Sequence, residues 1–167
     1  MDYRRRRLSQ RIRTQVVIAA WLMLTVLVQT MLLPTIVGAI INLALAATVC
    51  WTLVDSTTMG AVVGFYGGLM LDLLSQSPLG SHALALLLVA GGTALIAQRF
   101  PADNWIVPLF LVATLTPLYQ VLVQVAAGGT NDWLSWAVVV LVPAIVINAA
   151  IALPTFLVIR WWAERRA

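Results

Sequence analysis

The sequence contains no lysine and only one cysteine and one histidine, Cys50 and His82, among its 167 residues. One cysteine cannot form an intramolecular disulfide, and with one histidine it cannot supply the ligands of a histidine or thiolate metal site. Cys50 lies inside an apolar run, which is typical of a small buried side chain. We therefore expect no disulfide, no metal ion and no cofactor.

Carboxylates are also scarce, and their positions argue against catalysis. Asp55, Asp103 and Asp132 fall in predicted turns and Asp2 lies in the N-terminal segment. Asp72 is thus the one aspartate expected inside a membrane segment, where an intramembrane aspartic protease needs two. Ser81 precedes His82, but adjacent residues on a helix point about 100° apart, and no glycine-serine elbow is present. An ion-coupled transporter would need several buried charges and an internal repeat, and neither is visible. We expect a protein that is not an enzyme.

Charge of either sign is rare, at 10% of residues compared with about 25% in soluble domains. Hydrophobic residues make up 62% of the chain, and the mean hydropathy is +0.97. A water-soluble fold could not cover so much apolar surface, so lipid must cover it. The composition predicts an all-α, polytopic integral protein of the inner membrane.

Helix breakers and interfacial residues divide the chain into six apolar segments that predict a six-helix transmembrane bundle. The first segment reads as a retained span and not as a cleaved signal peptide, because it lacks a small-residue exit and leads straight into another span. Ser77 and Pro78 are expected to cap and to begin the fourth helix. The spans are expected at about 14–33, 36–54, 59–74, 78–99, 105–127 and 133–162, between a cytoplasmic arginine-rich N-terminus at 1–13 and a cytoplasmic C-terminus at 163–167.

All basic residues are arginine, and on this span assignment they lie on one side of the membrane. They are Arg4, Arg5, Arg6, Arg7, Arg11, Arg13, Arg99, Arg160, Arg165 and Arg166. Positive charge next to a span is retained in the cytoplasm, so we expect a multi-pass protein with both termini inside. Anionic lipid accounts for the net charge of +4 without a nucleic-acid partner.

Small residues recur every fourth position in the third expected span, at Gly60, Gly64 and Gly68, and Asp72 continues the same face. Such a stripe lets another helix backbone approach closely. The neighbouring helix could belong to the same bundle or to a partner, and both readings stay open. Asp72 could be tied to the start of the next helix or to His82, or it could make a functional contact.

Polar residues gather at the depth expected for the outer half of the membrane. Polar groups there must find partners inside the protein or line a wet cavity. They could therefore form scattered interhelical hydrogen bonds, or they could form an outward-facing pocket or a groove for a partner's transmembrane helix. This outer polar cluster contains Gln29, Asn42, His82, Thr116, Gln120 and Gln124, with Thr25 and Asp72 beside them.

The stretch from Gly64 to Leu84, GFYGGLMLDLLSQSPLGSHAL, resembles the signature region of the bacterial rod shape-determining MreD family. Asp72, Pro78 and Gly80 match that family's positions. The resemblance implies a non-enzymatic scaffold of the elongasome in the bacterial inner membrane, which regulates lateral peptidoglycan synthesis. It would pair with MreC and, indirectly, with RodA, a penicillin-binding transpeptidase and MreB. Assembly as a homo-oligomer is left open.

MreD proteins are similar in fold to the S components of energy-coupling-factor transporters, which makes a solute-binding subunit of a vitamin transporter the alternative. An S component would be expected to show an Ala-x-x-x-Ala motif on its first helix and longer outer loops. Ala19, Ala20 and Met23 do not form that motif, and the expected outer loops are only a few residues long. The sequence favours the scaffold.

Overall fold

Helices make up all the regular structure in the part of the chain that the computed structural model describes, which is residues 23, 26, 27, 29, 41–75, 77–99 and 104–165. The prediction of an all-α protein is confirmed for these residues. The span expected at 14–33, apart from four positions, and the arginine-rich segment 1–13 lie outside them. The helices are α3 (Leu43–Val54), α4 (Thr57–Leu74), α5 (Ser81–Ala97), α6 (Ile106–Ala126), α7 (Trp133–Trp136), the π-helical η1 (Ala137–Leu141) and α8 (Val142–Glu164).

Three helical stretches are long and apolar enough to cross a membrane: α4, α6 and the continuous path from Trp133 to Glu164. The helices α3 and α5 are also apolar but shorter. This agrees with an integral membrane protein, and the count of six spans remains a prediction. The path from Trp133 contains 32 residues, which corresponds to about 48 Å of helix, well beyond a hydrocarbon core of about 30 Å.

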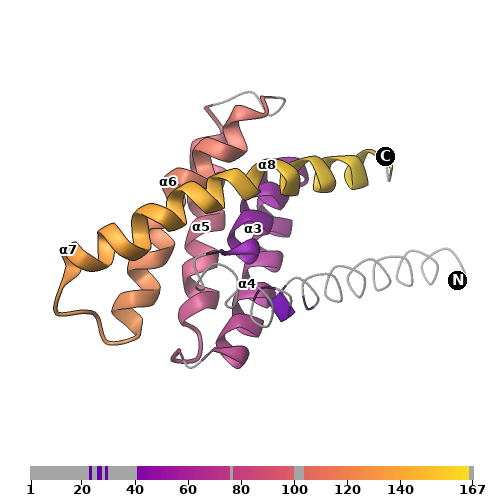
Figure 1. Ribbon diagram of the computed structural model, residues 1–167. Coiled ribbons are helices and arrows are strands. Elements are labelled where there is room, and N and C mark those ends of the chain that lie inside the picture. The colour runs from indigo at the N-terminus through magenta and orange to yellow at the C-terminus, as the bar shows by residue number, and fades with distance from the viewer. Residues whose placement is uncertain are drawn as a thin grey trace, which may run out of the picture.

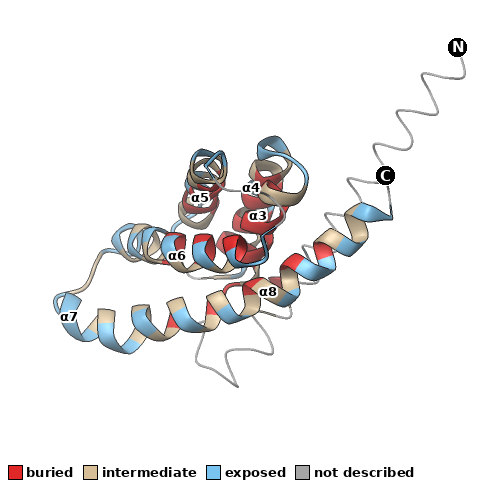
Figure 2. Ribbon diagram, turned by 90° about the horizontal axis from the view of Figure 1, so that it is seen from above, coloured by how far each residue is buried: buried red, intermediate tan, exposed pale blue. Residues whose placement is uncertain are grey.

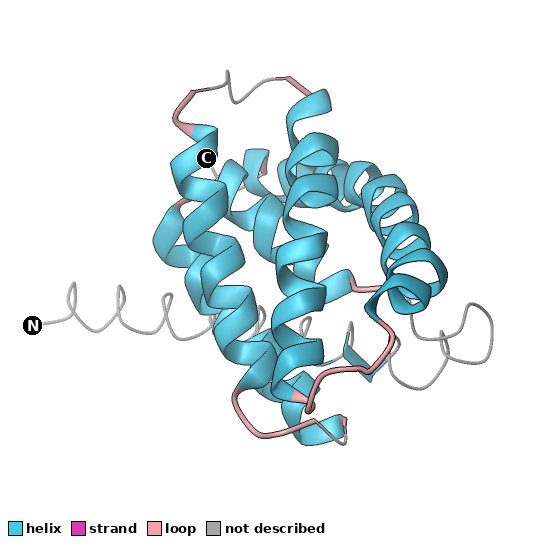
Figure 3. Ribbon diagram, turned by 90° about the vertical axis from the view of Figure 1, so that its left-hand side faces the viewer, coloured by secondary structure: helices cyan, strands magenta, loops and turns pink. Residues whose placement is uncertain are grey.

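The helix α3 forms the centre of the bundle. It packs against α4, α5, α6 and α8, and nine consecutive residues from Ala44 to Thr52 are buried. Figure 1 shows α4, α5 and α6 side by side, with α8 running obliquely across the bundle and α7 at the far end of its path, and Figure 3 shows the bundle from the side. The buried residues concentrate on α3 and on the faces turned toward it (Figure 2). A helix that is apolar all round is expected in such a central position.

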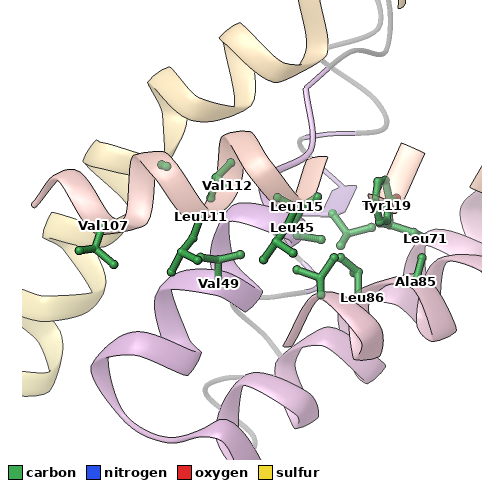
Figure 4. Packing of buried hydrophobic residues seen from close by; sticks show 14 residues of the cluster. Leu45, Val49, Leu71, Ala85, Leu86, Val107, Leu111, Val112, Leu115 and Tyr119 are labelled. Carbon is green, nitrogen blue, oxygen red and sulfur yellow. The ribbon is translucent and has the colours of Figure 1, made fainter. Parts of the chain in front are cut away.

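The main core cluster runs along the bundle between α3, α5 and α6. Leu45 and Val49 of α3 meet Leu86 of α5 and Leu111 of α6, and all four side chains are fully buried. Figure 4 shows this row, with Val107 at one end and Tyr119 near Leu71 at the other. A second cluster joins α3 to α4 and α8 through Trp51, Val63, Phe156 and Ile159.

The structure describes the starts of α3 and α5. Helix α3 begins at Leu43, where Asn42 caps it, and residues 36–40 of the span expected from Ile36 lie outside the described part of the chain. The expectation that Pro78 is the first helical residue of α5 is wrong, because Pro78, Leu79 and Gly80 form a turn before Ser81. Gly80 has φ +93°, a left-handed conformation that glycine adopts without steric cost and that cannot continue a right-handed helix.

The π-helical segment η1 has a local cause in Pro143. Proline has no backbone N–H, and its ring clashes with the carbonyl four residues earlier, which is Val139 inside η1. Widening one turn from α to π geometry relieves that clash. The helical path therefore continues past the proline instead of ending at it.

Candidate functional site

The carboxylate of Asp72 holds the last turn of α4 against the first turn of α5. Its Oδ2 accepts hydrogen bonds from the backbone N–H groups of Gly80 (3.0 Å) and Ala83 (3.2 Å). Its Oδ1 accepts from the N–H of His82 (2.9 Å) and from the hydroxyl of Ser81 (3.3 Å). The side chain is only 2% exposed. A carboxylate at this position satisfies the free N–H groups of the helix start and complements its positive end.

Asp72 is needed because α5 begins without a cap of its own. The N-cap residue is Gly80, which has no side chain and so makes no side-chain cap hydrogen bond. Of the roles considered for Asp72, the tie to the next helix is the one that the hydrogen bonds show. The contact with His82 runs through the backbone N–H and not through the imidazole.

The glycine stripe of α4 lies inside the bundle. A Cβ on Gly68 would stand 2.5 Å from Cα of Ala83 in α5, and a Cβ on Gly64 would stand 3.1 Å from the carbonyl oxygen of Leu86. A Cβ on Gly60 would overlap the side chain of Thr52 in α3. These contacts favour packing within the protein, since a partner helix on this face would have to displace α3 or α5.

The N-terminus of α3 is satisfied by side-chain amides from distant segments. Oε1 of Gln29 accepts from the N–H groups of Leu43 (2.8 Å) and Ala44 (3.4 Å). Oδ1 of Asn42 accepts from the N–H of Leu45 (2.9 Å). Oδ1 of Asn148 in α8 accepts from the backbone N–H of Asn42 (2.8 Å).

This capping is required because α3 starts deep in the protein. The helix has 12 residues and is about 18 Å long, compared with a hydrocarbon core of about 30 Å. Its other end leads into the exposed turn at Asp55 and Ser56. If that turn lies at one membrane surface, the start at Leu43 lies within the hydrocarbon region, where every backbone group needs a partner inside the protein.

A cavity of about 270 Å³ opens where α4 ends and α5 begins. Four members of the outer polar cluster line it, namely Gln29, Asn42, His82 and Gln120. The remaining lining residues are Ile41, Leu71, Leu74, Ser75, Tyr119 and Val123. The other two members of the cluster bond locally: the Thr116 hydroxyl donates to the carbonyl of Val112 (2.7 Å), and the Gln124 amide donates to the carbonyl of Gly129 (3.0 Å).

Sequence reasoning missed Tyr119, the aromatic residue of the cavity. Its hydroxyl lies 2.5 Å from Nδ1 of His82, and the side chain is 3% exposed. The two rings are tilted by 35° to each other, with 5.8 Å between their centroids. The sequence did contain a signal for it, because a tyrosine hydroxyl one position before Gln120 is expected at the same membrane depth as the outer polar cluster. Within the described residues, no three His, Cys, Asp or Glu side chains gather in a possible metal site.

Comparison with known proteins identifies the family. The family model described as rod shape-determining protein MreD matches residues 42–165, which include every helix described above. Comparison with curated proteins and with solved structures returned no match.

Proposed function

The chain belongs to the MreD family of rod shape-determining proteins, and from that premise we propose that it is a non-enzymatic membrane scaffold of the elongasome. Family membership gives it a role in rod shape determination and places it in a structural family. The finer proposal is that it pairs with MreC and so connects with RodA, its penicillin-binding transpeptidase partner and MreB. The single observation that carries the proposal is the family match across 42–165.

The proposed topology is a six-span bundle of the bacterial inner membrane with both termini in the cytoplasm. The arginine distribution supports it, because Arg99, Arg160 and Arg165 all lie at helix ends that the topology places inside. A periplasm-only reporter enzyme fused after Ala167 should be inactive, and the same reporter inserted at 128–130 should be active. Activity at the C-terminus would overturn the topology.

The α4–α5 hairpin, residues 69–84, is the proposed contact site for MreC. Asp72 ties its two sides together, and Gly68, just before it, packs against the backbone of Ala83, so the hairpin presents a fixed surface. Around that backbone the leucines point outward, with Leu73 68%, Leu79 74% and Leu84 65% exposed. Leu79 stands in the turn itself, between Pro78 and Gly80, which are the positions that match the family. A rigid backbone with exposed apolar side chains suits recognition by another membrane protein.

The test replaces exposed leucines so that the fold is not disturbed. Leu79→Ser should reduce co-purification of MreC and widen or round the cells when the variant is the sole copy. Leu95→Ser is the matched control, because Leu95 is equally exposed (70%) but lies near the other end of α5. Equal effects of the two changes would contradict a contact centred on the hairpin. The double change Asp72→Ala with Pro78→Ala should impair rod elongation more strongly, since it also loosens the hairpin backbone.

The second candidate is a solute-binding subunit similar to the S components of vitamin transporters. The observation in its favour is the cavity at the hairpin, which has polar side chains on its walls. The two candidates separate in one experiment. In a solute-binding subunit, the Asp72→Ala and Pro78→Ala double change should abolish vitamin uptake and leave the cells rod-shaped. In a scaffold, it should alter the shape and leave uptake unchanged.

A further inference from the structure

The cavity at the α4–α5 hairpin has an uncharged lining. Among the described residues that line it there is no Arg, Asp or Glu. Asp72 is close in the chain to Leu71 and Leu74, which form part of the wall, but its two oxygens are occupied by four donors from the start of α5. A charged ligand would find no counter-charge on this wall, and burying an unpaired charge is costly. The lining therefore selects a neutral group.

Several polar groups of the lining keep unused hydrogen-bonding capacity. Oε1 of Gln29 is engaged by the backbone of α3, and among the described residues its Nε2 has no acceptor. Nδ1 of His82 is hydrogen-bonded to the hydroxyl of Tyr119, so the other ring nitrogen, Nε2, is the one that can bind a ligand. The Gln120 amide forms no hydrogen bond with the described part of the chain, so it offers both a donor and an acceptor. Groups that donate and accept side by side are complementary to hydroxyl groups, which do the same.

The remaining wall and the size of the cavity restrict the ligand further. The aliphatic side chains of Ile41, Leu71, Leu74 and Val123 offer a surface for C–H groups. The volume of about 270 Å³ lies just below the range of about 300–1,000 Å³ that is typical of small-molecule pockets. A peptide strand is less suitable, because the backbone around the cavity is helical and offers no free edge for pairing.

We propose that this cavity binds a single uncharged polyhydroxyl group of about the size of one sugar ring. Such a group has hydroxyls for the two glutamines and His82 and a C–H face for the aliphatic wall. It could be a free sugar or the headgroup of a neutral glycolipid, which offer the same chemistry. The proposal goes beyond the scaffold function, because a scaffold needs no small ligand, and it does not depend on MreC.

The test uses the purified full chain in phosphatidylcholine nanodiscs and follows its thermal unfolding midpoint. One arm adds methyl glucoside to the solution, and the other includes monoglucosyl diacylglycerol in the discs. Ligand that binds the folded protein raises the midpoint. We expect a rise in at least one arm, and the arm that responds at the lower concentration identifies the source of the sugar.

Variants connect the rise with the cavity. Gln120→Leu should raise the ligand concentration that gives half of the midpoint shift at least tenfold. The control is Gln98→Leu, which changes an exposed glutamine at the other end of α5 and should leave that concentration unchanged. Ser75→Ala is a second test at the cavity wall and should raise the same ligand concentration severalfold. The proposal is overturned if neither arm shifts the midpoint, if Gln120→Leu and Ser75→Ala respond like the unaltered chain, or if glycylglycine shifts it as strongly as the glucoside.

Discussion

The first backbone N–H groups of α3 and of α5 both need hydrogen-bond acceptors from outside the helix, and the two helices obtain them from different side chains. At α5 one carboxylate, Asp72, accepts four hydrogen bonds from a segment that begins eight residues later. At α3 the acceptors are three neutral amides, and the bond from Asn42 to Asn148 spans 106 residues. The α5 cap is charged and comes from the preceding helix. The α3 cap is neutral and combines its own N-cap residue, Asn42, with amides of Gln29 and Asn148 from distant segments.

This difference matches the depth of the two helix starts. The start of α5 follows a turn with exposed residues, where water can help to solvate a carboxylate during assembly. The capping side chains themselves are buried at both starts, with Asp72 2%, Asn42 4% and Asn148 0% exposed, so the difference lies in the exposed turn that precedes α5. Neutral amides at such a depth cost far less to bury than charged groups. The α5 cap therefore needs only the two helices of the hairpin, whereas the α3 cap also needs Asn148 of α8.

The largest expected effect is from Asp72→Ala. The change leaves the backbone N–H groups of Gly80, His82 and Ala83 without their acceptor, whereas the Ser81 hydroxyl keeps the carbonyl of Pro78. Hydrogen bonds to charged groups contribute about 1.5–3 kcal/mol each. We expect a loss of about 3 kcal/mol or more in the free energy of unfolding, measured by denaturant titration in bicelles. Asp55→Ala, in an exposed turn, is the control and should change stability by less than about 0.5 kcal/mol. A similar loss of unfolding free energy in both variants would contradict a special role of the Asp72 cap in stability.

Gly68→Ala should have the next largest effect. The added Cβ would press on the backbone of Ala83, whose N–H is bound to Asp72, so α4 and α5 must separate at the cap. Overpacking of this kind costs about 1–3 kcal/mol. In contrast, a Cβ on Gly91 meets nothing within 4 Å, and Gly91→Ala should be neutral or stabilising by up to about 1 kcal/mol. The same denaturant titration compares the two glycine variants. If Gly68→Ala does not lower the free energy of unfolding, α4 and α5 are less closely packed than described.

Asn148→Ala tests the α3 cap and should have a smaller effect. It removes the acceptor of the Asn42 N–H, but it also removes Nδ2 of Asn148, which is buried and has no partner among the described residues. The expected loss is about 1–2 kcal/mol. Asn131→Ala, in an exposed loop, should leave stability unchanged. If the loss for Asn148→Ala exceeded that for Asp72→Ala, the ranking of the two caps would be reversed.

The smallest effect is expected at a third cap, on the surface. Asp132 accepts a hydrogen bond from the N–H of Ser135 (3.0 Å) at the start of α7, and hydrogen bonds from Ser135 lower the pKa of its carboxyl below the usual 3.8. A lowered pKa in the folded state means that the cap stabilises above pH 3.8 and is lost as the pH falls through the folded-state pKa. Carbon-13 NMR of the Asp132 carboxyl in bicelles should show a midpoint below 3.8 that returns toward 3.8 in Ser135→Pro, which has no N–H.

The tie between α4 and the start of α5 could be predicted from the sequence, whereas the long-range contacts at the start of α3 could not. The spacing of Gly60, Gly64, Gly68 and Asp72 predicts a shared helix face, and a carboxylate shortly before a Pro-Leu-Gly turn indicates a tie to the following helix. The start of α3 gives no such signal, because Asn42 continues an apolar run. Its need for Gln29 and Asn148 appears only when three distant segments meet. Tyr119 was missed for the same reason, since its partner His82 is 37 residues away.

The most direct test of the account is crosslinking at the α4–α5 hairpin in living cells. A photoreactive amino acid is placed at Leu79 in one strain and at Leu95 in another, both highly exposed on the folded chain. The proposed scaffold function predicts a crosslinked product that contains MreC from position 79 and none from position 95. A product with MreC from position 95 and none from position 79 would contradict the assignment of the hairpin as the contact site.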